Sequence, residues 1–434
     1  MDDESRNRDR RRWGLVFAIC LAVVARIAAC ISFAPDRFDV DQYQAIASTL
    51  AEHGVYGTSP NRPTAFRPPL YPMALALLGP SGSGARLRIL ALQAFFGALT
   101  VWLTYRIATK LNSSSTVDSS TRVAPTLAAV LVALDPILLR QSTAAMTEPF
   151  AAMLATVGVL CLVRLGDAPS WKRGLLAGLI LGLAALCRPT FVIWAGLVVI
   201  WLGVLGVRQK KFRAITCSVA LGVAAMLTPW TARNYVVMGH PIFATTHGGY
   251  TLWLGNNHLF YAHLRSRGPA ELWDSKDLDA RFAQMGADLE YDERRVDREC
   301  YRLAKATIAD DPRGFALSSV VRAGRLFQPI PNQVSGNEGN MNRAIRYGIG
   351  VWYFLVGGGL VIGLWSVRRD LRSTRHMPTL LLVFAFVGLH TFYWSNMRMR
   401  APLMPALSVL VAIGWPKLRL FVIRHWLDRR STRM

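Results

Sequence analysis

Long apolar stretches separated by short polar links run through most of the 434 residues of this chain. The apolar stretches recur at lengths of about 18–22 residues, which is enough for a helix to cross a lipid bilayer. We expect ten transmembrane helices, at residues 13–33, 87–108, 123–139, 149–165, 174–187, 190–207, 214–230, 345–366, 377–394 and 402–421. The pattern therefore predicts an all-α polytopic membrane protein.

Two longer polar segments, 35–86 and 233–343, interrupt the apolar pattern. They divide the chain into a membrane module at 1–232, which includes the loop 35–86, a polar segment at 233–343 and a second membrane module at 344–434. Within the loop we expect a short helix at 42–53 that ends at Gly54, because glycine readily adopts the left-handed conformation that stops a helix. In the polar segment we expect helices near 277–309 and 313–327.

The distribution of charge predicts how these segments face the membrane. The formal charge is +23, and the basic residues gather in the short links between apolar stretches. The positive-inside rule explains this better than nucleic-acid binding, for which we find no motif. We therefore expect both termini and the basic tail in the cytoplasm, the segments 35–86 and 233–343 on the outer face, and the protein in the cytoplasmic (inner) membrane.

The cysteines and histidines indicate neither disulfides nor a metal site. Five of the six cysteines lie in apolar stretches, and only Cys300 lies in a polar region. His247 and His258 have no metal-ligand spacing with any cysteine or other histidine. We expect no cofactor, and the sequence leaves the need for a divalent ion open.

The first outer loop carries the most concentrated polar chemistry. Asp39 and Asp41 precede the predicted helix, Tyr43 begins it, and Arg67 stands before a stiff Pro-Pro-Leu-Tyr-Pro segment. Carboxylates and an arginine at a membrane surface fit a phosphorylated lipid substrate. The alternative is that the aspartates cap the helix, that Tyr43 packs in the interior and that Arg67 anchors to lipid headgroups.

Further polar candidates lie at other predicted outer turns. Glu148 is costly at the edge of a span unless it has a partner or a role, and it could simply pair with Arg140 or Arg188. Interfacial arginines often contact only solvent or headgroups, so each of these has a structural alternative. The further candidates are Glu148, Arg188, Arg233, Asn234, Arg398 and Arg400. If the arginines converge with Arg67, we expect them to form a phosphate site beside Asp39.

The order of short motifs along the chain resembles the GT-C superfamily of membrane glycosyltransferases. The closest patterns are those of protein O-mannosyltransferases and lipid A aminoarabinose transferases. The first loop has an aspartate four residues before a tyrosine, and Val40 stands where these relatives have glutamate. The motifs are Asp39 to Tyr43, Arg67-Pro-Pro-Leu-Tyr-Pro, Thr147-Glu-Pro, Arg188-Pro, Pro229-Trp-Thr-Ala-Arg-Asn-Tyr, His247-Gly-Gly-Tyr-Thr-Leu-Trp-Leu-Gly-Asn-Asn and Arg398-Met-Arg-Ala-Pro.

The resemblance implies an inverting transfer of a sugar from a polyprenyl-phosphate donor to an acceptor protein, lipid or glycan. Phosphate leaves without a general acid, so the reaction needs cations on the phosphate and one base for the acceptor hydroxyl. Asp39 matches the family aspartate and is the expected base, with Asp41 as the second candidate. The alternatives are a transporter or flippase for a lipid-linked substrate, and a binder of lipid-linked sugars without catalysis.

Overall fold

The computed structural model describes residues 3–33, 35, 37–112, 123–332 and 339–414. Almost all of its regular elements are helices, with one two-stranded antiparallel hairpin. The elements of the N-terminal half are α1 (Asp3–Ser32), α2 (Tyr43–His53), β1 (Gly57–Ser59), β2 (Arg62–Pro63), α3 (Leu70–Ala76), α4 (Ala85–Asn112), α5 (Ala124–Ala133), α6 (Pro136–Gln141), α7 (Glu148–Asp167), α8 (Trp171–Cys187), α9 (Thr190–Arg208) and α10 (Lys211–Met238). The elements that follow are α11 (Gly248–Gly255), α12 (His258–Ser266), α13 (Lys276–Asp288), α14 (Glu293–Asp310), α15 (Pro312–Leu326), α16 (Asn340–Val367), α17 (Met377–Phe392) and the 3₁₀ helix η2 (Met397–Leu403).

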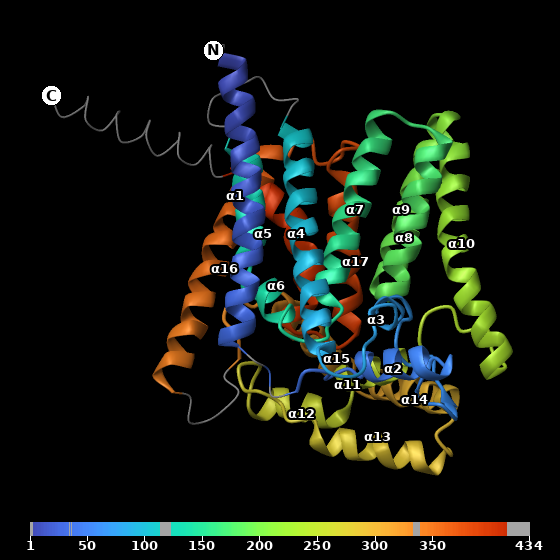
Figure 1. Ribbon diagram of the computed structural model, residues 1–434. Coiled ribbons are helices and arrows are strands. Elements are labelled where there is room, and N and C mark those ends of the chain that lie inside the picture. The colour runs from blue at the N-terminus through green and yellow to red at the C-terminus, as the bar shows by residue number, and fades with distance from the viewer. Residues whose placement is uncertain (1–2, 34, 36, 113–122, 333–338, 415–434) are drawn as a thin grey trace.

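The long helices form one bundle, and the short helices gather at one of its ends (Figure 1). Seven helices in the described residues are long and apolar enough to span a membrane, and α5 and α17 are shorter apolar helices. Helix α8 runs beside them, and η2 continues as an α-helix to Gly414. The chain is therefore an all-α, multi-pass membrane protein, as the apolar pattern predicts. The end of the tenth predicted span and the basic tail, at 415–434, lie outside the described residues.

The predicted span 123–139 is not continuous, because it breaks between α5 and α6. Pro136 lacks a backbone N–H and disfavours helical geometry at the residue before it, so the helix cannot run through this position. Asp135 has an extended ψ of 120°, and its side chain accepts a hydrogen bond from the Leu138 N–H at 2.9 Å, which caps α6. The Tyr353 hydroxyl of α16 also donates to this buried carboxylate.

Helices α8 and α10 pack closely through glycines, as the small residues of the fifth predicted span indicate. A Cβ at Gly178 would lie 2.2 Å from the Val219 carbonyl oxygen, and one at Gly222 would lie 2.6 Å from the Leu175 carbonyl oxygen. Both positions therefore require glycine. Helix α8 leads directly into Arg188, so this packing also sets where that side chain begins.

The two polar segments lie together at the same end of the bundle (Figure 1). Helix α2 ends at Gly54, whose φ of 70° and bond to the Leu50 carbonyl confirm the predicted stop. The predicted helix 277–309 divides into α13 and α14, because Glu290 and Tyr291 adopt positive φ and Asp292 caps α14. The predicted helix at 313–327 corresponds to α15.

A single carboxylate ties the polar segments to each other. Glu293 of α14 accepts hydrogen bonds from the Ala65 N–H at 3.0 Å and from the Thr246 hydroxyl at 2.7 Å, and it also contacts the Thr64 hydroxyl. The first loop is thus fixed against the segment that follows α10, and both face the end of the bundle.

Candidate functional site

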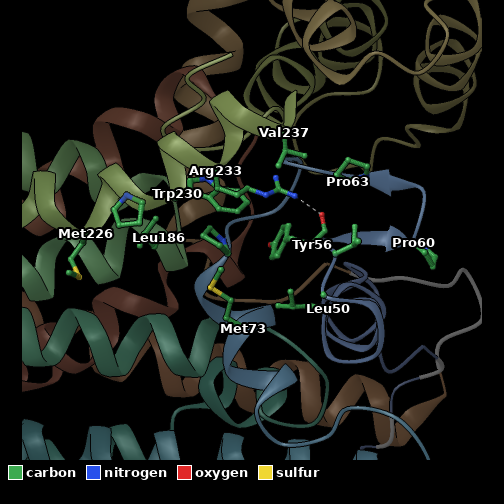
Figure 2. Close-up of a pocket in the computed structure, with 14 residues that line it drawn as sticks. Leu50, Tyr56, Pro60, Pro63, Met73, Leu186, Met226, Trp230, Arg233 and Val237 are labelled. Carbon is green, nitrogen blue, oxygen red and sulfur yellow. Dashed lines mark hydrogen bonds between the residues drawn. The ribbon is translucent and has the colours of Figure 1, made fainter. Parts of the chain in front are cut away.

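An apolar groove opens at the end of the bundle where the polar segments meet α8 and α10 (Figure 2). Its volume is about 500 Å³. Leu186 of α8, Met226 and Trp230 of α10, and Leu50 of α2 line it, and Arg233 is the one charged residue among its described lining residues. Such a lining suits a hydrocarbon chain rather than a charged group.

Arg233 stabilises one wall of this groove by hydrogen bonds to the first loop. Its guanidinium donates to the carbonyl oxygens of Thr64 at 2.9 Å and Tyr56 at 3.0 Å, and it lies over the Trp230 ring at 5.2 Å. Asn234 is fully buried, accepts a hydrogen bond from Arg233 and donates to the Ile242 carbonyl. These two predicted site residues therefore support the loop.

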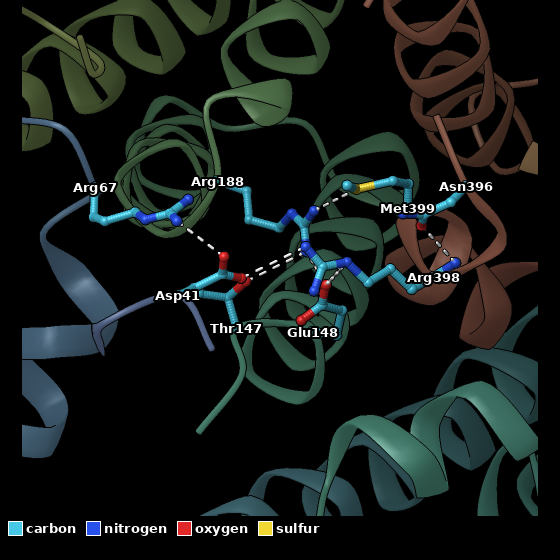
Figure 3. Close-up of polar contacts among 8 residues, drawn as sticks. All are labelled: Asp41, Arg67, Thr147, Glu148, Arg188, Asn396, Arg398 and Met399. Atoms are coloured by element: carbon cyan, nitrogen blue, oxygen red, sulfur yellow. Dashed lines mark hydrogen bonds and ion pairs between the residues drawn. The ribbon is translucent and has the colours of Figure 1, made fainter. Parts of the chain in front are cut away.

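Three arginines converge around two carboxylates (Figure 3), near the start of α7 and the end of α8. Asp41, in the turn before α2, accepts a hydrogen bond from Arg67 at 2.9 Å, and its other oxygen lies 3.5 Å from Arg398 of η2. Arg67 is held between aromatic rings, 5.6 Å from the Tyr43 centroid and 5.2 Å from that of Phe66. The first loop and η2, far apart in sequence, thus share one ion pair.

The second carboxylate belongs to Glu148, the first residue of α7. Its side chain is 1% exposed and lies 2.9 Å from Arg188 and 3.6 Å from Arg398. Arg188 follows the end of α8, and it also contacts the Thr147 hydroxyl at 3.3 Å and the Met399 sulfur at 3.0 Å. The pairing of Glu148 with Arg188 is one of the two partners expected from sequence, but Arg398 extends the pair into a cluster.

The arginine cluster, defined as Asp41, Arg67, Glu148, Arg188 and Arg398, carries three positive and two negative formal charges. It therefore has an excess of positive charge in a largely buried place, where electrostatic interactions are strong. Two of its buried atoms, Glu148 Oε2 and Arg398 Nε, have no hydrogen-bond partner among the described residues. A buried polar atom without a partner is costly, so this arrangement can receive both an anion and a hydroxyl group.

Asp39 and Asp41 have different surroundings although one residue separates them. Oδ2 of Asp39 accepts a hydrogen bond from the Ala45 N–H at 3.0 Å, and Oδ1 is buried without a hydrogen-bond partner in the described part of the chain. Burial raises the pKa of Asp39, and the backbone N–H groups of α2 offset this only in part. Burial acts in the same sense on Asp41, but Arg67 and Arg398 outweigh it and lower its pKa. Asp39 is thus the more basic carboxylate of the two.

Two other predicted site residues, Tyr43 and Arg400, lie outside the ion pairs of the cluster, although the Tyr43 ring packs against Arg67. Tyr43 is buried, packs edge-on against Tyr71 at 5.3 Å, and burial raises its pKa to about 12. Arg400 donates to the carbonyl oxygens of Leu326 at 3.0 Å and Gln328 at 2.8 Å, and it lies 4.1 Å from the Tyr353 ring centroid. The five predicted arginines therefore do not form one site, since Arg233 and Arg400 bind backbone carbonyls elsewhere.

Thr147, Met399 and His247 lie in the motifs named from the sequence, but the sequence assigned none of them a role in the site. Thr147 and Met399 touch Arg188, and His247 lies close enough to Arg67, Asp41 and Arg398 to interact with their charges. The glycines after His247 were the available signal, because they mark a close backbone approach. No group of three or more His, Cys, Asp or Glu side chains that could hold a metal ion occurs in the part of the chain that the structure describes.

Comparisons with known proteins bear on this geometry. The family model described as dolichyl-phosphate-mannose-protein mannosyltransferase matches residues 79–212. The oligosaccharyltransferase of Archaeoglobus fulgidus, solved in complex with Zn and sulfate, has a TM-score of 0.51 and 15% identity over 94% of this chain and 51% of its own. This chain has the GT-C fold.

The GT-C fold confirms the resemblance drawn from the motifs, and the chain spans about half the length of the oligosaccharyltransferase. ArnT from Cupriavidus metallidurans, solved with undecaprenyl phosphate bound, has a TM-score of 0.42 and 13% identity over 93% of this chain and 78% of its own. No curated protein matches the chain. The matched range includes Glu148 and Arg188 but not Asp39 and Asp41.

Proposed function

We propose that this protein is an inverting glycosyltransferase that moves a sugar from a polyprenyl-phosphate carrier to an acceptor on the outer face of the cytoplasmic membrane. The observation that carries the proposal is the arginine cluster, which places three guanidinium groups around a largely buried centre beside the first loop. The matched family model supports the donor class, since its printed name describes transfer from dolichyl phosphate mannose.

The apolar groove supports a lipid-linked donor as well. It lies between the first loop and the ends of α8 and α10, and Leu186 in its wall is separated from Arg188 of the cluster by only one residue. A polyprenyl chain in the groove would leave its phosphate near the guanidinium groups. Arginine suits this task because its planar fork binds phosphate oxygens in pairs.

The proposed chemistry is a single displacement. The acceptor oxygen attacks C1 of the sugar, the bond between C1 and the phosphate oxygen breaks, and the acceptor proton passes to a carboxylate. The released phosphate gains negative charge as the bond breaks, and the nearby arginines stabilise that charge. Attack from the face opposite the phosphate inverts C1.

We assign the base to Asp39 and the ordering of the arginines to Asp41. A carboxylate bonded to arginine is a weaker base, and Asp41 pairs with both Arg67 and Arg398. Asp39 lies in the same turn, pairs with no arginine among the described residues and has a raised pKa. The acceptor is a protein, a lipid or a glycan.

Arg398 provides the sharpest test, because it is the most exposed arginine of the cluster and contacts both carboxylates. We expect Arg398→Gln to weaken binding of undecaprenyl phosphate by about tenfold or more, the usual loss for a hydrogen bond to a charged group. Binding of undecaprenol, which lacks the phosphate, should not change. Arg295→Gln, at an exposed position of α14, is the matched control and should bind both lipids like the wild type.

The transfer itself is measured in detergent with purified protein. The donor lipid is extracted from a strain lacking the gene and incubated with an envelope extract that contains the acceptor. We expect release of polyprenyl phosphate by the wild type and a tenfold or greater loss in Arg398→Gln. A transporter or flippase needs two compartments, so binding of the lipid without any sugar transfer in detergent would overturn the proposal.

A further inference from the structure

The segment His247-Gly248-Gly249-Tyr250 fixes one histidine at the start of α11. A Cβ at Gly248 would lie 2.2 Å from the Tyr301 hydroxyl oxygen, and a Cβ at Gly249 would lie 2.1 Å from the Asp297 carbonyl oxygen. Only glycine allows α11 to approach α14 this closely. The Gly249 N–H also donates to Asp297 Oδ1 at 2.6 Å. His247 therefore lies directly before a helix that is packed closely against α14.

The imidazole ring of His247 is held by aromatic contacts. Phe66, the neighbour of Arg67, packs edge-on at 4.3 Å between ring centroids, and Tyr250 stacks on the ring at 5.3 Å. Nδ1 is buried and has no hydrogen-bond partner among the described residues. The charged groups that act on the ring are Arg67, Asp41 and Arg398, all members of the arginine cluster.

The chemistry of this ring complements that of the arginines. Burial, together with Arg67, lowers the pKa of His247 to about 3, so the ring is neutral at physiological pH. A neutral imidazole offers one donor and one acceptor nitrogen, whereas a guanidinium group has no acceptor. The arginines can therefore bind phosphate oxygens, but the proton of a hydroxyl group needs an acceptor such as the imidazole.

We propose that Nδ1 of His247 binds a substrate hydroxyl group, either of the transferred sugar or of the acceptor. This inference rests on the proposed function and adds a substrate-binding residue to it. The hydroxyl group supplies the hydrogen-bond partner that the protein itself does not give to Nδ1, and Phe66 and Tyr250 hold the ring in place for it.

The test compares His247→Phe, which keeps an aromatic ring but removes both nitrogens, with His247→Asn, whose amide restores a polar atom near Nδ1. We expect His247→Phe to lower sugar transfer by about tenfold or more, the usual effect of one lost hydrogen bond. Its melting temperature should not fall, because Nδ1 makes no hydrogen bond to any described residue. His247→Asn should recover part of the rate.

His258→Phe, which makes the same substitution at an exposed histidine of α12, is the matched control and should transfer sugar like the wild type. The donor lipid from the deletion strain identifies which hydroxyl group is bound. Weaker donor binding by His247→Phe indicates a sugar hydroxyl, whereas unchanged donor binding with slower transfer indicates the acceptor hydroxyl.

Two results would overturn the inference. One is a transfer rate within twofold of the wild type in His247→Phe, and the other is a loss of rate that is matched by a loss of thermal stability. Neither result overturns the proposed function, which is tested separately by Arg398→Gln and by sugar transfer of the wild type in detergent. The two proposals can therefore fail separately.

Discussion

At the residue scale, the two carboxylates of the first loop divide their roles through their partners. Asp41 is bonded to Arg67 and faces Arg398, whereas Asp39 accepts a hydrogen bond from the backbone of α2. The helix-cap interpretation of Asp39 thus agrees with its contacts, and it does not conflict with a role as base, because only Oδ2 makes the bond and Oδ1 has no partner in the described part of the chain. The pKa of the group is raised, which suits proton transfer near neutral pH.

Asp39→Asn separates a catalytic base from a cap. The asparagine oxygen still accepts the Ala45 N–H, so the cap remains, but the base is lost. We expect a fall of about 100- to 10,000-fold in turnover with unchanged affinity for undecaprenyl phosphate. Asp41→Asn should instead weaken that affinity, since it releases Arg67 and Arg398.

The stability of Asp39→Asn should change in the opposite direction to its activity. The pKa of Asp39 is higher in the folded state than in the unfolded chain, so its contribution to stability is present at low pH and is lost as the pH rises through the folded value. Asparagine imitates the protonated form, so the melting temperature at pH 7 should equal or exceed that of the wild type. Normal turnover in Asp39→Asn would remove this residue from the reaction.

At the scale of elements, the site depends on where the helices of the bundle begin and end. Arg188 directly follows α8, and Glu148 is the first residue of α7. The 3₁₀ helix η2 carries Arg398 and is anchored by Arg400, whose guanidinium donates to the carbonyl oxygens of Leu326, the last residue of α15, and Gln328, and lies over Tyr353 of α16. The Tyr353 hydroxyl in turn donates to Asp135 at the break between α5 and α6. Buried polar contacts between helices thus position η2 and, with it, Arg398 of the cluster.

Gly178→Val tests whether the close packing of α8 and α10 supports the site. A Cβ at Gly178 would meet the Val219 carbonyl oxygen at 2.2 Å, so the helices must separate. We expect a lower melting temperature, by several degrees, because overpacking costs about 1–3 kcal/mol. Sugar transfer should also decline, because Arg188 follows α8.

Gly196→Val on α9 is the control for this substitution. It adds the same side chain to another helix of the bundle, at an exposed position where a Cβ meets no atom within 4 Å. We expect its melting temperature and transfer rate to match those of the wild type. Equal effects of the two substitutions would show that close packing of α8 against α10 is not required.

At the scale of the whole molecule, the two ends of the helix bundle differ. The short helices gather at one end, where α7 begins and α8 ends, and the links between α7 and α8, α9 and α10, and α16 and α17 lie at the other (Figure 1). Asp167 at the end of α7 binds Lys110 of α4 at 2.6 Å and Arg375 before α17 at 3.1 Å, which joins three helices at this second end. The links at this second end are rich in lysine and arginine, as expected of the cytoplasmic side.

Reporter fusions test this orientation. A reporter placed after Lys211, at the basic link before α10, should give a cytoplasmic signal. One placed near Asp277, in α13, should give a signal from the outer compartment. The measurement is the paired activity of a cytoplasmic and a periplasmic reporter at each position, and the same compartment for both positions would contradict the proposed orientation.

The sequence by itself determined the class of molecule and the position of its segments along the chain. Apolar length and basic links are local properties, so they indicate the spans and the two polar segments without knowledge of the fold. Gly54 ends α2 as predicted, because its left-handed conformation is set by the residue itself. The order of short motifs was enough to indicate the GT-C fold.

Only the tertiary structure decided which polar residues meet. Arg398 and Arg400 lie on one 3₁₀ helix with about three residues per turn, so their side chains leave in different directions, one toward Glu148 and the other toward backbone carbonyls. The position of His247 depends on contacts with Phe66 and Tyr250 and on the approach of α11 to α14. Such contacts join residues that are distant in sequence, and no local pattern records which of them will face each other.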